Sequence, residues 1–235
     1  MMSIADQDID QLGGPWSILV RQRRDHEHLD VLLHQLDVAP AGAEEERVLG
    51  RIARLVFPHA FAEESVLWPE LRRRLPDGEA LTLQVEREHQ EVNELWTALE
   101  QLPAVGAARC DVLKRLADVL REDVRDEEDE LLPRLQQVTS VPRLRALGVA
   151  WEAVRRTAPT RPHPVVSRRP PGNALAAVPL TVLDRSRDGL DAVARRVPRL
   201  HPVATRASGA LAGAAGRVEW AGVLRRGEDP STRVE

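Results

Sequence analysis

The chain has 235 residues, and its net charge of −4 conceals two regions of opposite charge. Residues 1–139 hold 16 basic and 29 acidic residues, whereas residues 140–235 hold 17 basic and 8 acidic residues and 10 of the 17 prolines. A hydrophobic content of 43% is sufficient for a buried core, but no stretch is long and apolar enough for a membrane-spanning helix. The single cysteine, Cys110, excludes an internal disulfide framework and a thiolate zinc cluster.

We expect three parts along the chain. Residues 1–15 form an acidic N-terminal segment without the apolar region of a secretory signal. Residues 16–138 form a helical domain, and residues 139–235 form a basic tail. These features predict a cytoplasmic protein that has no membrane partner.

Helical periodicity of the apolar residues predicts four long helices in residues 16–138. They extend over about 16–36, 44–75, 79–102 and 108–137. Pro58 and Pro69 predict a kink and a terminal break within the second helix. Because strand patterns are essentially absent and the connections are short, the sequence predicts an all-α, antiparallel up-down four-helix bundle.

The tail has a different composition, rich in proline, arginine and alanine, and we expect it to be largely irregular. Residues 155–172 are typical of an extended, solvated linker. Short helices are expected at 179–197, which has an amphipathic pattern, and near 218–224.

An internal repeat relates the two halves of the helical domain. Residues 24–32 align with 87–95 at an offset of 63, which places His26 on His89. A second pair of segments, 59–71 and 123–135, aligns at an offset of 64. Each half is therefore expected to form a helical hairpin, and the two hairpins to pair into the bundle.

The repeat selects candidate metal ligands by position. His59 and Glu63 are four residues apart and share one helix face, and Asp123 and Glu127 repeat this spacing. Histidines of the other two helices complete the set, because bundle-core metal sites take inward-pointing donors from facing helices. The candidate ligands are His26, His59, Glu63, His89, Asp123 and Glu127. Nitrogen and oxygen donors without a thiolate suit iron or manganese, and zinc is the remaining option.

These motifs resemble the hemerythrin-like HHE cation-binding family over roughly residues 16–138. The resemblance is carried by Asp-His and the apolar stripe at 25–33, His-x3-Glu-Glu-x3-Trp-Pro-x-Leu at 59–71, Glu-His at 88–89 and Glu-Glu-x3-Leu-Pro-x-Leu at 127–135. It implies a four-helix bundle with a non-haem di-iron centre. It also implies small ligands, namely O2, NO or peroxide, and a role in binding or sensing O2, NO or iron.

Two positions depart from the family pattern. Asp123 stands where the family has a histidine. Asn93 stands one turn after His89, where oxygen carriers have a second histidine on the third helix. These departures argue against reversible O2 carriage. They favour a carboxylate-rich site that is asymmetric or mononuclear.

Two alternative functions remain open at this point. One is a di-iron enzyme with peroxidase, catalase-like or oxidase activity, and the other is a metal-free interaction bundle. A ferritin-like site is disfavoured, because it needs two Glu-x-x-His motifs and Glu86–His89 supplies one. We expect Glu64 and Glu128 to lie outside the ligand set, His28 and His34 to lie on the surface, and Trp68 to serve packing.

The basic tail suggests two kinds of partner, nucleic acid or an acidic protein surface. Nucleic acid is disfavoured, because Trp151 and Trp220 are the tail's only aromatic residues and cannot form a stacking platform. The opposite charges of the two regions favour docking of the tail on its own acidic bundle or on an acidic protein.

Overall fold

The structure, a computed structural model, describes residues 1–234, which are mostly helical and contain no strand. The all-α prediction is therefore confirmed. A short 3-10 turn, η1 (Ile4–Asp6), precedes the first long helix. The helices of the predicted bundle are α1 (Ile18–Val38), α2 (Ala43–Ala62), α3 (Trp68–Arg74), α4 (Gly78–Gln101), α5 (Ala107–Asp126) and α6 (Leu132–Val138).

The predicted second and fourth helices each contain a π-helical turn. The turn η2 (Glu63–Leu67) joins α2 to α3, and η3 (Glu127–Leu131) joins α5 to α6. Pro69 lies in the first turn of α3, where a missing backbone N–H costs no hydrogen bond. The helix therefore continues to Arg74, and the wide turn precedes Pro69 in place of the predicted break.

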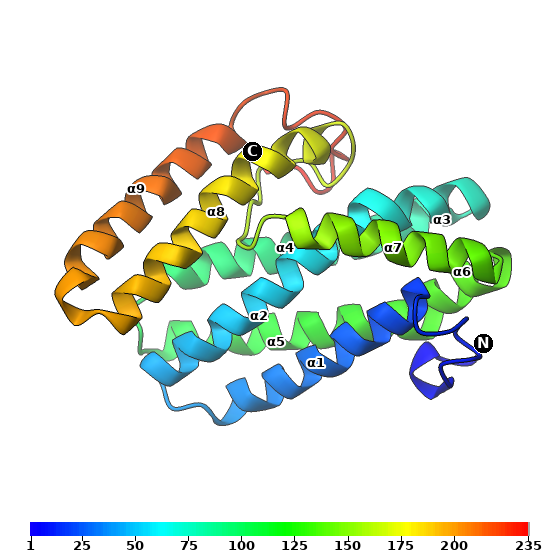
Figure 1. The fold of residues 1–235 in the computed structure, drawn as a ribbon, viewed down its shortest axis with the longest axis horizontal. Coiled ribbons are helices and arrows are strands. Elements are labelled where there is room, and N and C mark those ends of the chain that lie inside the picture. The colour runs from blue at the N-terminus through cyan, green and yellow to red at the C-terminus, as the bar shows by residue number, and fades with distance from the viewer. Residues whose placement is uncertain (235) are drawn as a thin grey trace.

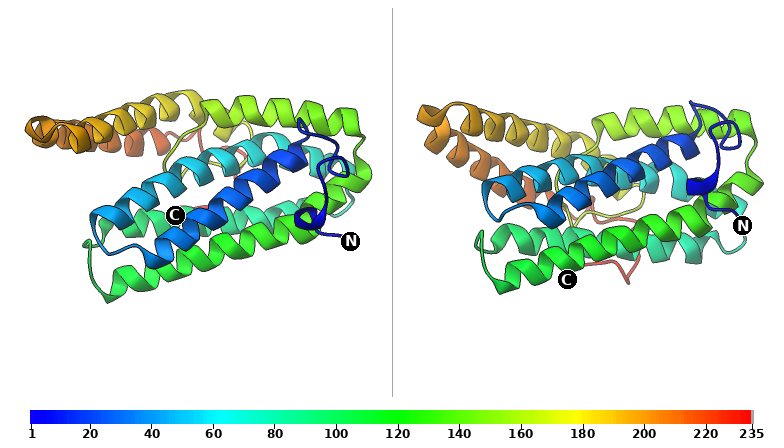
Figure 2. Two further views of the ribbon diagram at one scale, coloured as in Figure 1. Left: turned by 60° about the horizontal axis from the view of Figure 1, so that its bottom comes forward. Right: turned by 90° about the horizontal axis from the view of Figure 1, so that it is seen from below.

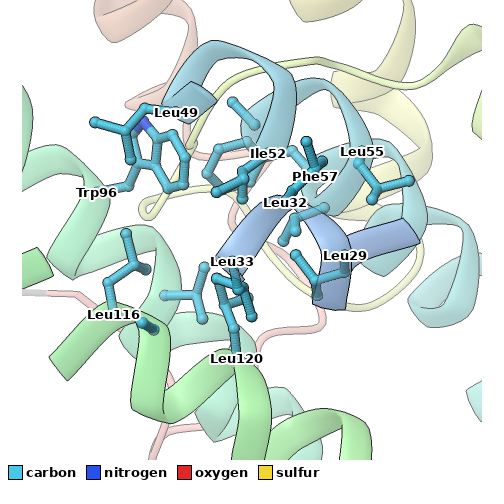
Figure 3. Packing of buried hydrophobic residues seen from close by; sticks show 14 of the residues in the cluster. Leu29, Leu32, Leu33, Leu49, Ile52, Leu55, Phe57, Trp96, Leu116 and Leu120 are labelled. Atoms are coloured by element: carbon cyan, nitrogen blue, oxygen red, sulfur yellow. The ribbon is translucent and has the colours of Figure 1, made fainter. Parts of the chain in front are cut away.

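The long helices lie side by side as a helical bundle (Figures 1 and 2). Helix α1 packs on α2, and α5 and α3 both pack on α4. Ser17 caps α1 by accepting a hydrogen bond from the backbone N–H of Leu19, which satisfies one of the helix's free donors. Figure 3 shows side chains of α1, α2, α4 and α5 converging in one apolar core. Its labelled members are Leu29, Leu32, Leu33, Leu49, Ile52, Leu55, Phe57, Trp96, Leu116 and Leu120.

The C-terminal extension is mostly helical, so the prediction of a largely irregular tail is wrong. It contains α7 (Val141–Thr157), α8 (Gly172–Arg196), a 3-10 turn η4 (Pro198–Leu200) and α9 (His201–Glu219). The helix expected at 179–197 lies almost wholly within α8. The short helix expected near 218–224 is not observed, because α9 ends at Glu219. Packing against other helices stabilises segments whose own sequence signal is weak.

Helix α7 belongs to the packed core of the bundle. It contacts α1, α2 and the turn η2. Gly148 permits the close approach, because a Cβ at this position would lie 2.3 Å from the carbonyl oxygen of Trp16. Trp151 is fully buried in a second apolar cluster with residues of α1, α3 and α6. The packed core therefore extends beyond residue 138, the predicted domain boundary.

Helices α8 and α9 pair as a hairpin at the edge of the bundle, with its tip pointing away from it (Figure 2). The linker 158–171 connects α7 to this hairpin, and a small apolar cluster around Val166, Leu180 and Leu224 holds the linker, the hairpin and the C-terminal loop together. Among the described residues, no helix has the length and apolar character needed to cross a membrane.

Candidate metal centre

The fold brings the six predicted ligands into one buried cluster inside the bundle. The potential ligand atoms form two groups, and within each group they lie within 4.8 Å of one another. The first group is His26, His59, Glu63 and Glu127; the second is His89, Asp123 and Glu127. Glu127 belongs to both groups, and Glu63 Oε2 also lies 3.7 Å from His89 Nε2. Two glutamates therefore lie between the two groups.

Each histidine directs its Nε2 atom toward a carboxylate of the cluster. The distance is 3.2 Å from His26 Nε2 to Glu127 Oε2 and 2.9 Å from His59 Nε2 to Glu63 Oε1. His89 Nε2 lies 3.6 Å from Asp123 Oδ1. Three imidazole nitrogens and three carboxylates thus converge on a common space.

The opposite ring nitrogen of each histidine is held by a second carboxylate. Nδ1 of His26 lies 2.9 Å from Glu128 Oε1, and Nδ1 of His89 lies 3.0 Å from Glu64 Oε1. Nδ1 of His59 lies 3.4 Å from Asp25 Oδ2. The partners of the three histidines are Glu128, Glu64 and Asp25. Carboxylates in this position fix the ring and its tautomer in metal sites, leaving Nε2 free for an ion.

Several carboxylate oxygens of the cluster are buried without a hydrogen-bond donor. They are Oε2 of Glu63, Oε1 of Glu127 and Oδ1 of Asp123. An ionised oxygen removed from water without a partner is costly unless a cation compensates it. The orphaned oxygens and the inward-pointing Nε2 atoms face the same space, so the residues fit one or two bound cations. The mixed nitrogen and oxygen donor set suits iron, manganese or zinc.

Burial and mutual repulsion raise the pKa of two carboxyl groups of the cluster. Burial and the charge of Glu127 raise the pKa of Glu63 above its ordinary value. Burial raises the pKa of Asp123 well above its ordinary value, and the charges of Glu127 and Glu63 add to this effect against the opposing charge of His89. The acids are therefore too close together to remain ionised without positive charge among them.

The histidines supply positive charge in the absence of metal. Burial lowers the pKa of His26, but its hydrogen bonds with Glu127 and Glu128 outweigh burial and raise the pKa to about 9. Burial also lowers the pKa of His89, but the charge of Asp123 and the hydrogen bond with Glu64 outweigh burial and raise the pKa to about 10. Because a ligand nitrogen must lose its proton before it binds a metal, occupation of this site releases protons.

Both π turns begin at a candidate ligand, Glu63 in η2 and Glu127 in η3. Short π-helical segments within α-helices are frequent at functional sites. The wide turn allows two consecutive carboxylates to act: Glu63 faces the cluster, while Glu64 reaches His89. The sequence signal for these turns is the repeat-matched proline six residues after each glutamate, which cannot donate to the preceding turn.

The remaining predictions around the site have clear outcomes. His28 and His34 are exposed, as predicted. Trp68 is fully buried, which confirms its packing role, and its ring stacks on His89 with centroids 6.3 Å apart. Asn93 joins neither ligand group, because its amide donates to the carbonyl of His89 and accepts from the backbone N–H of His163.

Trp151 is a residue of the site that sequence reasoning missed. It lies on α7, and its ring meets that of His59 edge-on with centroids 5.3 Å apart. It therefore covers the histidine from a helix that lies outside the predicted domain 16–138. No local sequence signal could find this contact, since the two residues are far apart in the chain.

The family described as hemerythrin HHE cation binding domain matches residues 17–135. An uncharacterized hemerythrin-like protein of Schizosaccharomyces pombe is 24% identical over 134 residues, which are 57% of this chain and 66% of that protein. A DNA nickase of Nostoc sp. is 28% identical over 117 residues, 48% of this chain and 32% of that protein. The chain thus spans less than two thirds of the length of these relatives. No solved structure matches.

Proposed function

The chain belongs to the hemerythrin HHE cation-binding family, and from this premise we propose that it binds non-haem iron in the bundle core and thereby binds or senses O2, NO or iron itself. The observation that carries the proposal is the pair of ligand groups that share Glu127. A shared carboxylate with a second one beside it, Glu63, is an arrangement suited to two neighbouring cations. The family's antiparallel up-down bundle is part of this proposal.

The two ions would have unequal surroundings. His26 and His59 would hold the first ion, His89 and Asp123 the second, and the two shared glutamates would lie between them. Asp123 provides a short carboxylate where the family has a histidine. The second position is therefore richer in oxygen donors than the first. Hard oxygen donors favour the more highly charged ferric ion, which supports sensing over reversible O2 carriage.

Iron at this site would supply an open coordination position and a one-electron redox couple. The protein's own residues orient and enclose the site. Glu128, Asp25 and Glu64 hold each imidazole with Nε2 turned inward. Trp68 and Trp151, both fully buried, cover His89 and His59 and exclude water from that side.

The test is the iron content of the full chain after expression in iron-replete medium, together with its visible spectrum. Two irons per chain would support a di-iron centre. One iron would indicate a mononuclear site, as expected if Asp123 leaves the second position empty. Iron near zero would contradict the proposal and favour the metal-free interaction bundle.

A matched pair of variants locates the iron. His59→Ala removes a ligand and should abolish most of the iron and its spectrum. His34→Ala makes the same substitution on an exposed residue of α1 and should leave both unchanged. A spectral change on adding O2 or NO, without turnover, supports binding or sensing. Peroxide turnover that is lost in His59→Ala would assign a peroxidase or catalase-like enzyme instead.

A further inference from the structure

Two arginines of the C-terminal extension contact the carboxylates that hold the site histidines. Arg155 Nη1 on α7 lies 3.6 Å from Asp25 Oδ2, the oxygen that faces His59 Nδ1. Arg168 Nη1 in the linker lies 3.7 Å from Glu64 Oε1, the oxygen that faces His89 Nδ1. In both cases one carboxylate oxygen is shared by a guanidinium and a histidine.

The third histidine lacks this feature. His26 is held by Glu128, and among residues 1–234 Glu128 forms no ion pair with an arginine. The extension therefore adds a positive charge behind one histidine of each ligand group, His59 in the first and His89 in the second. This leaves His26 as the site histidine without an arginine of the extension behind its carboxylate partner among residues 1–234.

Both arginines are held in place by further contacts. The Arg155 guanidinium lies over the ring of Trp151, 5.2 Å from its centroid, and pairs with Glu152. Arg168 is buried, and its Nη2 donates to the carbonyl oxygen of His163 at 3.1 Å. The charge of Arg168 is screened weakly by solvent because the residue is buried, whereas Arg155 is partly exposed and shares its charge between Asp25 and Glu152.

The chemistry follows from the hydrogen bond between carboxylate and imidazole. A carboxylate that accepts the Nδ1 proton makes the imidazole a stronger donor to a metal. A guanidinium beside that carboxylate draws off part of its negative charge and so weakens this effect. It also adds a positive charge near the metal, which destabilises the ferric ion more than the ferrous ion.

We propose that Arg155 and Arg168 are positioning residues through which the C-terminal extension raises the reduction potential of the iron centre, acting by way of Asp25 and Glu64. The inference rests on the proposed function. It assigns the extension an effect on the redox chemistry of the centre, in addition to its packing against the bundle.

The neighbouring Arg169 provides a matched control. It joins the same linker to the bundle through ion pairs with Glu86 and Glu79, neither of which contacts a site histidine. Arg169→Gln therefore removes an ion pair between the linker and the bundle without altering the surroundings of the site histidines. Arg168→Gln removes both the docking contact and the charge behind His89.

The experiment is redox titration of the iron-loaded full chain, followed by its visible spectrum, with thermal unfolding of the metal-free chain as a second readout. We expect the midpoint potential to fall in Arg155→Gln and in Arg168→Gln, and to fall further in the double variant. Arg168→Lys should restore most of the wild-type potential, because it keeps the charge. Arg169→Gln should lower the unfolding temperature and leave the potential unchanged.

The results separate this inference from the proposed function. Wild-type protein without iron overturns the proposed function and this inference with it. Iron in the wild type, with unchanged potentials in both glutamine variants, overturns this inference alone and leaves the arginines as docking residues. An equal potential shift in Arg169→Gln would also overturn it. If Arg168→Gln does not fold, Arg155→Gln on the separate helix α7 decides the question.

Discussion

Replacing His163 with glutamine would remove a buried charge that joins the linker to both helices of the α8–α9 hairpin. His163 Nε2 lies 3.0 Å from Asp184 Oδ2 on α8, and Nδ1 lies 2.8 Å from Glu219 Oε1 on α9. Its backbone N–H donates to the side chain of Asn93 on α4. Glutamine keeps hydrogen-bonding capacity at this position but cannot carry the proton that balances the two acids.

The size of the expected stability loss follows from the pKa of the His163 imidazole. Burial lowers the pKa of His163, but hydrogen bonds with Asp184 and Glu219 outweigh burial and raise the pKa from 6.5 to about 9. At about 1.4 kcal/mol per pKa unit, this shift corresponds to about 3 kcal/mol of stability. Because the pKa is raised in the folded state, this stability is fully present below about pH 6.5 and is lost as the pH rises through about 9.

The measurement is the free energy of unfolding of wild type and His163→Gln by denaturant at several pH values between about 6 and 10. The difference between the two proteins should be largest at the acidic end, up to about 3 kcal/mol, and should shrink through the upper half of this range. The three site histidines titrate in both proteins, so their effect cancels in the difference. A difference that does not change with pH would refute the reasoning.

Three further predictions concern the core, the α7 contact and the ligand set. Leu32→Ala should lower the free energy of unfolding by about 2–5 kcal/mol, because Leu32 is fully buried; a loss below about 1 kcal/mol in denaturant titration would contradict the described core. Gly148→Ala should lower the unfolding temperature and expose α7 to protease, since its Cβ would meet the backbone of Trp16; unchanged protection of α7 would show that the close approach is absent. Asp123→His should raise the number of irons per chain if the wild type binds fewer than two; an unchanged iron content would show that Asp123 does not limit the second position.

The helices of the bundle could be predicted because each has a long apolar stripe at helical spacing. Helix α7 could not, since its important residues, Gly148 and Trp151, make their contacts with α1 and α2 rather than with neighbours in sequence. The hairpin α8–α9 was predicted only in part, because its small residues carry little hydrophobic signal. Packing against the rest of the chain decides the structure of such segments.

The positions of the six candidate ligands could be predicted because the internal repeat places equivalent residues on equivalent helices. The repeat also brings out Glu64 and Glu128 as matched residues, yet their contact with Nδ1 atoms depends on the π turns, which periodicity alone does not show. Arg155 and Arg168 lie outside the repeat. Their contact with the site depends entirely on the path of the extension, so no local pattern could identify them.

The π turn η2 also determines how the chain responds to a change in its length. Each residue of an α-helix advances the chain by about 100° and about 1.5 Å, so the wide turn sets the angle between the faces of α2 and α3. Deleting Ser65 would restore ordinary helical geometry and leave the fully buried Trp68 and Leu71 facing the core, but it would remove the wide turn that lets Glu63 and Glu64 both reach the site. The number of residues between Glu63 and Trp68 is thus a requirement for two consecutive carboxylates to act at the site.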